Sequence, residues 1–198
     1  MIYQKYRNLR SKAIGYLDEL SLEILELDKK YLKALSDSDL LNRYSRLLIL
    51  FTYFGDGYLW GIIGLSLIIF GGTQDQNYVL LGLAIAIIDI TAFRLVKMVV
   101  ERPRPVILVK NRPKLKFRLV DAFAFPSGHA TMAFSISYLI AQFYPNFWAP
   151  AGAYLASVLI GLSRVYVTEH FPLDIVGGAI LGTAVSIGFT PLFYHLIF

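Results

Sequence analysis

Three groups of polar residues in this chain have the types and the order expected for chemistry on a phosphate group. Written as spacings, they are K-x6-RP, PSGH and SR-x5-H-x3-D. Such a set supplies what phosphoryl transfer needs: cations for the transferred oxygens, backbone N–H donors, a nucleophile, and an acid for the leaving group. The residues that carry this chemistry are Lys97 and Arg104 in the first group, Ser127, Gly128 and His129 in the second, and Arg164, His170 and Asp174 in the third.

His170 is the predicted nucleophile. Asp174 lies four residues later, so on a helix the two side chains share a face, and the carboxylate can hold the imidazole tautomer that leaves one ring nitrogen free to attack. His129 is the predicted general acid. It would protonate the departing oxygen and then act as the base for the water that hydrolyses a phosphohistidine intermediate.

A cradle of positive charge and backbone donors is expected around the phosphate. Lys97, Arg104 and Arg164 supply the charge, and the two arginines can grip oxygens in a planar fork that lysine cannot offer. Ser127 and Gly128 directly precede an apolar run. This pattern indicates a helix start, where Ser127 acts as the cap and free N–H groups point at an anion.

Together the three patterns resemble the signature of the type 2 phosphatidic acid phosphatases (PAP2), membrane lipid phosphatases whose superfamily also contains vanadate-dependent haloperoxidases. All three patterns match without a gap or substitution, and the resemblance extends over about residues 47–198. It implies a helical membrane enzyme that hydrolyses a lipid phosphate through a phosphohistidine. Because vanadate adopts the trigonal-bipyramidal shape of the transferring phosphoryl group, we also expect it to inhibit by binding at His170. The implied phosphate-binding residues are Lys97, Arg104, Ser127, Gly128 and Arg164, and the implied catalytic residues are His129, His170 and Asp174.

The composition indicates a membrane protein. Of the 198 residues, 56% are hydrophobic and only 17% are charged, which is too apolar for an ordinary soluble domain. We therefore predict an all-α polytopic membrane bundle of about five spanning helices, of which the third is short unless it begins inside the PSGH turn. The candidate spans are about residues 47–70, 78–100, 130–144, 149–167 and 171–198.

Residues 1–46 have a different character, and we treat them as a unit separate from the phosphatase-like domain at residues 47–198. Leucines alternate with acidic and basic residues at a spacing that fits one or two amphipathic helices at the membrane interface. A break is expected near Ser38 and Asp39, either of which could cap a second short helix that runs to Arg46. We interpret this segment as a helical arm that packs on the domain, with control of lipid entry as the alternative. PAP2 phosphatases typically have an additional spanning helix here, and we expect none in this segment from its sequence.

The distribution of charge predicts an orientation in a cell membrane. Five spans place residues 1–46 and both catalytic loops on one face, and all 19 lysines and arginines belong to this half of the molecule. Nine of them lie within residues 1–46. The positive-inside rule then places the site in the cytoplasm. The opposite orientation stays open, because a phosphate site must be basic for its chemistry and bacterial relatives commonly act at the outer face.

The expected partners are a lipid phosphate and the bilayer, with no obligate protein partner evident. The basic run at residues 101–118 contains a single aromatic residue, Phe117, which favours anionic lipid head groups over nucleic acid. The motifs contribute one carboxylate, so we expect no metal ion and no cofactor. They do not separate phosphatidylglycerophosphate, phosphatidic acid, undecaprenyl pyrophosphate and lipid A 1-phosphate as substrates. Two other classes stay open: a haloperoxidase that holds vanadate, and a non-catalytic lipid-binding or transport protein.

Three further features have a structural interpretation. The sequence Gly55-Asp56-Gly57 in the first span indicates a turn or a helix start, and we assign no chemical role to Asp56. Gly178 and Gly182 form a small-xxx-small pair, which predicts close packing of the last helix. Asp89 lies inside the second span and must face protein or the interface, because a carboxylate is costly in hydrocarbon.

Overall fold

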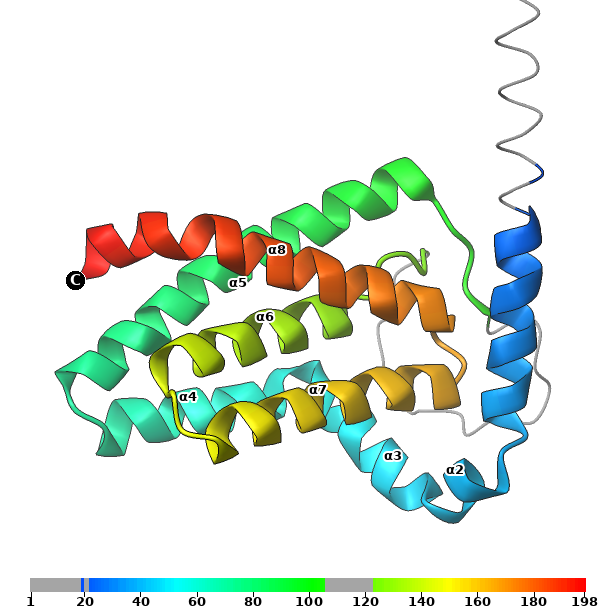
Figure 1. Cartoon of the computed structure of the whole chain (residues 1–198), viewed down its shortest axis with the longest axis horizontal. Helices are drawn as coiled ribbons and strands as arrows, with labels where there is room; N and C mark the ends of the chain where they lie inside the picture. The colour runs from blue at the N-terminus through cyan, green and yellow to red at the C-terminus, as the bar shows by residue number, and fades with distance from the viewer. Residues whose placement is uncertain (1–18, 20–21, 106–122) are drawn as a thin grey trace, which may run out of the picture.

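The computed structural model describes residues 19, 22–105 and 123–198, and over these ranges the fold is built from helices (Figure 1). This confirms the all-α prediction. A helix at residues 22–36 comes first. It is followed by α2 (Asp39–Arg43), α3 (Ser45–Tyr53), the π-helical turn η1 (Phe54–Tyr58), α4 (Leu59–Phe70), α5 (Thr73–Val100), α6 (Gly128–Phe143), α7 (Trp148–Tyr166) and α8 (Pro172–Ile197).

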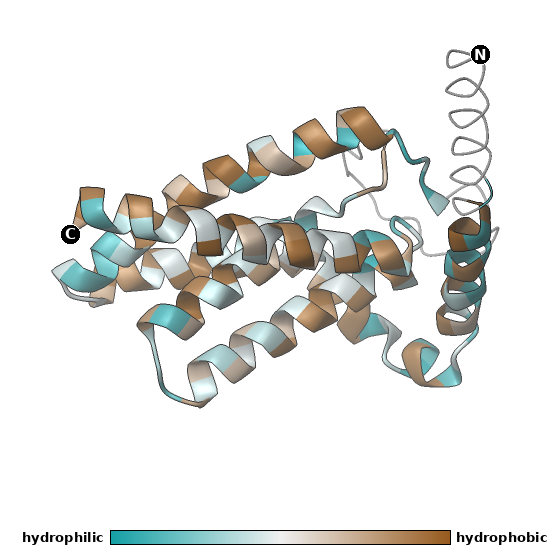
Figure 2. Ribbon diagram, turned by 45° about the horizontal axis from the view of Figure 1, so that its top comes forward, coloured by the Kyte–Doolittle hydropathy of each residue, from teal (hydrophilic) through white to brown (hydrophobic). Residues whose placement is uncertain are grey.

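Three helical segments of the described chain are long and apolar enough to cross a membrane: Ser45–Phe70, Thr73–Val100 and Pro172–Ile197. The first joins α3, η1 and α4 through a kink. The outward surfaces of α5 and α8 carry exposed leucine, isoleucine and valine side chains, which form brown stretches in Figure 2. These surfaces suit contact with lipid, because hydrocarbon offers no partners to polar groups.

The other two predicted spans, α6 and α7, do not meet the same criteria of length and composition. Helix α6 begins at Gly128, inside the PSGH turn, and has 16 residues, or about 24 Å of helix. It contacts α5, α7 and α8, so protein surrounds much of it. Its polar side chains are buried against other helices, where Ser135 bonds to Ser186 and Ser137 to Ser157. A helix enclosed in this way needs less hydrophobicity than one that faces lipid.

Close packing of α6 against α8 fixes the start of both helices. A Cβ atom at Gly178 would lie 2.5 Å from the carbonyl oxygen of Ser127, and one at Gly182 would collide with the backbone of Thr131. The predicted role of this glycine pair is therefore confirmed. The N–H of Ser127 also donates to the carbonyl of Asp174 at 2.9 Å. As a result, the PSGH turn and the start of α8 form one rigid unit.

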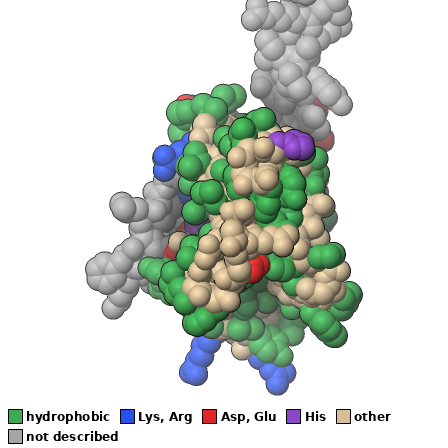
Figure 3. Space-filling model, turned by 90° about the vertical axis from the view of Figure 1, so that its left-hand side faces the viewer, with side chains coloured by type: hydrophobic (Ala, Val, Ile, Leu, Met, Phe, Trp, Pro, Cys, Tyr) green, Lys and Arg blue, Asp and Glu red, His purple; other side chains and the backbone are tan. Residues whose placement is uncertain are grey.

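The two ends of the bundle differ in chemistry. The end of α5, the start of α6, the end of α7 and the start of α8 meet at one end, so the three motifs come together as the alternating spans predicted (Figure 1). Figure 3 views the opposite end, where hydrophobic side chains and uncharged polar or backbone atoms make up nearly all of the surface and lysine and arginine appear only at the margins. Phe70, Phe147 and Trp148 are highly exposed there. The cationic chemistry is thus confined to one end.

The helix at residues 22–36 lies crosswise at the motif end of the bundle (Figure 1). Its Leu32 packs in a buried cluster with Val165 and Phe171, which flank the catalytic loop. Ser38 caps α2, since its Oγ accepts the N–H of Leu41 at 3.5 Å. The prediction that this second helix runs to Arg46 was wrong: α2 ends at Arg43, because Tyr44 leaves the helical conformation before α3 begins.

Candidate active site

The predicted site residues gather at the motif end of the bundle, around one end of a cavity of about 1100 Å³. Ser127 and Asp174 lie behind this lining, and both are fully buried. The basic loop at residues 106–118, predicted to contact lipid head groups, falls outside the described residues. The predicted residues that line the cavity are Lys97, Arg104, Gly128, His129, Arg164 and His170.

His170 is buried and surrounded by charge. Its side chain is 1% exposed, with Nδ1 3.6 Å from Asp174 Oδ2 and Nε2 3.3 Å from Arg104 Nη1. Burial, reinforced by the positive charges of Arg104, Arg164 and Lys97, lowers the pKa of His170 well below its usual 6.5. The imidazole is therefore neutral at physiological pH, which is the form in which a ring nitrogen carries a free electron pair.

Asp174 is held by more than the histidine. Its Oδ2 accepts a hydrogen bond from the N–H of Phe171, and its Oδ1 accepts one from Arg102 Nη1, each at 2.7 Å. These bonds are shorter than the 3.6 Å separation from His170, which exceeds a hydrogen bond. Sequence reasoning missed Arg102. The signal for it was the repeated Arg-Pro pair at residues 102–105, of which only the second fits the x6 spacing.

Arg102 connects the catalytic loop to the amino-terminal arm. Its Nη2 donates to Asp28 Oδ2 at 2.7 Å, and the guanidinium stacks on the ring of Phe171 at 4.5 Å. Asp28 also accepts the N–H of Leu173 at the start of α8 through Oδ1, at 3.1 Å. The carboxylate is fully buried. A residue of the arm thus takes part in the network that holds Asp174.

The three predicted phosphate-binding cations come from three segments. Lys97, in the last turn of α5, donates to the carbonyl of Phe123 at 2.8 Å. Arg104 donates to the carbonyl of Glu169 at 2.9 Å. Arg164, in the last turn of α7, forms an ion pair with the carboxylate of Glu169, which is itself buried. Glu169 was also missed by sequence reasoning, although its place directly before His170 makes it the one acidic residue between Arg164 and that histidine.

The PSGH turn places a helix start at the cavity. Ser127 is the N-cap of α6, and its Oγ accepts the N–H of Ala130 at 3.4 Å. This confirms the predicted helix start and cap. A Cβ atom at Gly128 would lie 3.1 Å from the ring of Phe93, so a larger residue would displace that ring. Gly128 and His129 line the cavity at the positive end of the helix dipole, which favours an anion.

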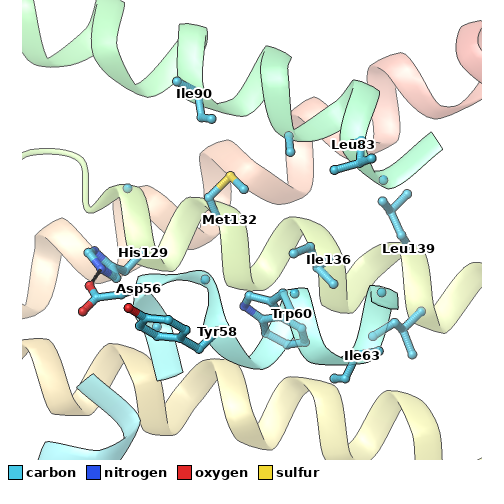
Figure 4. Close-up of a pocket in the computed structure, with 18 of the residues that line it drawn as sticks. Asp56, Tyr58, Trp60, Ile63, Leu83, Ile90, His129, Met132, Ile136 and Leu139 are labelled. Atoms are coloured by element: carbon cyan, nitrogen blue, oxygen red, sulfur yellow. Dashed lines mark hydrogen bonds and ion pairs between the residues drawn. The ribbon is translucent and has the colours of Figure 1, made fainter. Parts of the chain in front are cut away.

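His129 forms an ion pair with Asp56. The distance from Nε2 to Oδ1 is 2.8 Å, and the close-up in Figure 4 shows the two side chains meeting at one end of the cavity. Asp56 belongs to η1, in the first span, where the sequence alone indicates a turn or a helix start. An acidic residue between two glycines in an otherwise apolar segment was the signal that could have found it.

Beyond the charged groups the cavity is apolar and long. It follows α6 between α4 and α5 (Figure 4) and reaches Tyr78, Phe143 and Tyr144 near the opposite end of the bundle. From Gly128 to Phe143 the helix rises by about 22 Å. This depth and lining suit a hydrocarbon chain. Among the apolar residues along the way are Ile63, Leu83, Ile90, Met132, Ile136 and Leu139.

No group of three or more histidine, aspartate or glutamate side chains suited to a metal ion occurs in the described part of the chain. The positive charge at the cavity instead comes from lysine and arginine side chains. These groups can bind the oxygens of a phosphate directly.

The sequence profile of the PAP2 superfamily matches residues 77–197. The chain belongs to the PAP2 superfamily. The matched region contains all eight predicted site residues, whereas Asp28 and Asp56 lie before it. The match therefore covers the residues predicted to bind phosphate and both histidines, and it does not reach the arm or η1.

The known proteins that are similar to this PAP2 protein include the following three. The undecaprenyl-diphosphatase BcrC of Bacillus subtilis (strain 168) is 31% identical over 130 residues, which cover 66% of this chain and 64% of BcrC, just under two thirds of that relative's length. Aquifex aeolicus LpxE superposes with a TM-score of 0.66 at 27% identity, covering 81% of this chain and 93% of LpxE. The PAP2-type phosphatidylglycerolphosphate phosphatase of Bacillus subtilis superposes with a TM-score of 0.66 at 26% identity, covering 89% of this chain and 88% of that structure.

Proposed function

We propose that this PAP2 protein is an integral-membrane phosphatase that hydrolyses the terminal phosphate of a lipid phosphate or pyrophosphate through a phosphohistidine. One observation carries the proposal: a cluster of cations and two histidines, of which His170 is buried, opens directly into an apolar cavity that runs about 22 Å along α6. The charged end suits a phosphate and the apolar part suits its lipid chain. A soluble substrate would have no use for the second part.

The first chemical step joins the phosphate to His170. Nε2 of the neutral imidazole attacks phosphorus, and a P–N bond forms as the P–O bond to the leaving group breaks. The electron pair of that P–O bond stays on the leaving oxygen, which takes a proton from His129. Lys97, Arg104 and Arg164 stabilise the charge on the transferred oxygens, and the N-terminus of α6 adds backbone donors.

The second step releases the phosphate. His129, now neutral, takes a proton from a water molecule as its oxygen attacks phosphorus. The P–N bond breaks, and its electron pair returns to His170. Asp174 keeps the imidazole oriented through both steps, since its own position is fixed by Arg102 and by the N–H of Phe171. The enzyme ends the cycle in its starting state, with phosphate and a dephosphorylated lipid as products.

Two classes of lipid deserve the first tests. BcrC is named an undecaprenyl-diphosphatase, and one structural neighbour is titled a phosphatidylglycerolphosphate phosphatase. These names support a polyprenyl diphosphate and a glycerophospholipid phosphate as substrates. Both present a phosphate at the interface and apolar chains that fit the cavity beside α6.

The test is release of inorganic phosphate by the purified protein in detergent, in the presence of a chelator. The panel contains undecaprenyl pyrophosphate, phosphatidylglycerophosphate, phosphatidic acid, lipid A 1-phosphate and a water-soluble phosphomonoester. We expect release from at least one lipid, at a rate that chelator leaves unchanged and vanadate lowers, because vanadate adopts the shape of the transferring phosphoryl group. Folded protein that binds these lipids without releasing phosphate would instead be a lipid-binding protein.

We further propose that the site faces the cytoplasm, on the basis of the basic residues of the arm, which serve no catalytic purpose. The chain has no cysteine, so single cysteines can be labelled cleanly. Asp37→Cys reports on the motif end and Thr73→Cys on the other, and both positions are exposed. We expect a membrane-impermeant thiol reagent, added to intact cells, to label the Thr73→Cys variant. Labelling of the Asp37→Cys variant instead would place the site outside.

A further inference from the structure

The first spanning segment contributes a carboxylate to the candidate site. The turn η1 interrupts the helix between α3 and α4 and contacts α6. Asp56, in this turn, lies 2.8 Å from His129 Nε2, and both side chains are about one quarter exposed, at the cavity (Figure 4). The charged residues that line the same cavity also include Lys97, Arg104, Arg164 and Glu169.

Two glycines build the turn for two different reasons. Gly57 has a φ of 104°, in the left-handed region that a residue with a side chain rarely adopts. A Cβ atom at Gly55 would lie 2.8 Å from Ile160 Cγ2 and 3.1 Å from His129 Cδ2, so only glycine allows the turn to approach α6 and α7 this closely. The local sequence therefore places a carboxylate against His129 at a cost in helix regularity within a membrane span.

We propose that Asp56 is the positioning residue for the general acid His129, an inference that rests on the proposed function. Its carboxylate binds the Nε2–H of the ring and favours the imidazolium form, since a negative charge at hydrogen-bond distance stabilises a protonated histidine. With Nε2 held in this way, Nδ1 is the nitrogen that transfers the proton. It gives a proton to the leaving oxygen as the P–O bond breaks, and takes one from water in the second step. The same division of labour between two ring nitrogens operates wherever a carboxylate orients a catalytic histidine.

The inference predicts a dependence on the leaving group that a purely structural role would not produce. An alkoxide is a poor leaving group and needs a proton as the P–O bond breaks, whereas p-nitrophenolate leaves readily without one. Loss of a general acid therefore slows the first substrate far more than the second. Misfolding or a distorted cradle would slow both equally. The quantity to compare is kcat/KM, which reports on the formation of the phosphohistidine and excludes its later hydrolysis.

The experiment measures kcat/KM of wild type and Asp56→Asn with dioctanoyl phosphatidic acid and with p-nitrophenyl phosphate. We expect Asp56→Asn to lower the value about 10²-fold for the lipid and less than about 10-fold for the aryl phosphate. Asp56→Glu should restore part of the loss on the lipid. In a His129→Ala background, Asp56→Asn should have no further effect, because the two residues act as one unit.

A matched control uses another carboxylate, which lies on α5 and away from the motifs. Asp75 bonds to Tyr144 at the opposite end of the cavity. Asp75→Asn should leave the ratio of the two kcat/KM values as in wild type, whatever its effect on stability. Thermal unfolding and size-exclusion profiles show that each variant is folded.

Three results would count against the inference. Equal losses on both substrates in Asp56→Asn would make Asp56 a structural residue, and no loss on either would leave it without a role. Additive losses in the His129→Ala background would show that Asp56 acts through some other group. If wild-type protein releases no phosphate from either substrate, the proposed function fails and the inference falls with it. Wild-type activity together with any of the first three results overturns the inference alone.

Discussion

The two histidines of the site lie in opposite kinds of surroundings. His170 is 1% exposed and lies in a dense network to which α8, the segment after α5 and the arm each contribute a charged residue. His129 is 24% exposed, faces an apolar cavity, and pairs with a carboxylate on a turn of the first span. One histidine is held in place from several directions, and the other lies where substrate and water must reach it.

The difference agrees with the roles proposed for the two groups. A nucleophile attacks along one line, so rigid placement favours it. A general acid must exchange protons with a leaving group and then with water, so it needs access as well as orientation. The charges around His170 hold it neutral, whereas the carboxylate beside His129 stabilises a proton on that ring. The site thus separates its two histidines by electrostatics, although both belong to the same chemical type.

The largest effect should come from removing the nucleophile. His170→Ala should lower phosphate release at least about 10³-fold, because the proposed mechanism forms its P–N bond at this side chain. Binding of the lipid should persist, since the cation cradle and the apolar cavity stay intact. The measurements are phosphate release and lipid binding on the same preparation.

His195 provides the matched control for this prediction. It is exposed on α8 at the opposite end of the bundle, and His195→Ala should release phosphate at the wild-type rate. Undiminished release by His170→Ala would contradict the phosphohistidine mechanism, and with it the contrast between the two histidines.

The next effect tests how far the buried network serves catalysis. Asp174→Asn should lower kcat about 10²–10⁴-fold, because an amide has a single acceptor oxygen and cannot serve both Arg102 and the N–H of Phe171. Its NH2 group would meet a donor in either orientation. His170 would then lose its orienting charge.

Asp89 is a suitable control for the removal of a buried carboxylate. It is 1% exposed in α5 but does not line the cavity. Asp89→Asn should keep its kcat near that of wild type. Equal losses in the two variants would show that Asp174 matters for folding rather than for the orientation of His170.

The sequence predicted those parts of the site that depend on local chemistry. The helix start at Ser127, the glycine-dependent contact of α8 with α6, and the gathering of the three motifs at one end are all observed. Each depends on residue type and spacing within a segment. Helix α6 packs inside the bundle, against α5, α7 and α8. It therefore does not meet a criterion for membrane spans that is based on contact with lipid.

The partners that come from distant segments could not be predicted in this way. Arg102 meets Asp28 across 74 positions of sequence, and His129 meets Asp56 across 73. Nothing in the spacing of a single sequence reports which segments a bundle brings together. The sequence does not predict a role for Asp56, because the two glycines beside it already explain the segment as a turn.

A smaller effect should follow when the arm is uncoupled from the site. Asp28→Asn removes the charge that pairs with Arg102, and it weakens the hydrogen bond that Asp28 accepts from the N–H of Leu173. Arg102 stays paired with Asp174, so we expect kcat to fall only about threefold to tenfold. Amide exchange in residues 22–36 should rise, which mass spectrometry can follow.

Glu26 offers a control on the same helix, since it pairs with Lys29 on the exposed surface. Surface pairs of this kind contribute little, so Glu26→Gln should change neither kcat nor exchange. If Asp28→Asn behaves like Glu26→Gln, the arm serves only to cover the domain, and the network around His170 is confined to the motifs and Arg102.

The finest test concerns protonation of His170 itself. A lowered pKa means that the neutral ring persists as the pH falls from 8 through the usual 6.5, and that protonation begins only at lower pH. With three histidines in the chain, ¹⁵N spectra of imidazole-labelled protein can be assigned with His129→Ala and His195→Ala. We expect the His170 signals to stay those of a neutral ring as the pH falls through the usual 6.5. A signal that titrates near 6.5 would mean that the surrounding cations do not hold the nucleophile neutral. The electrostatic separation of the two histidines would then have to arise when substrate binds.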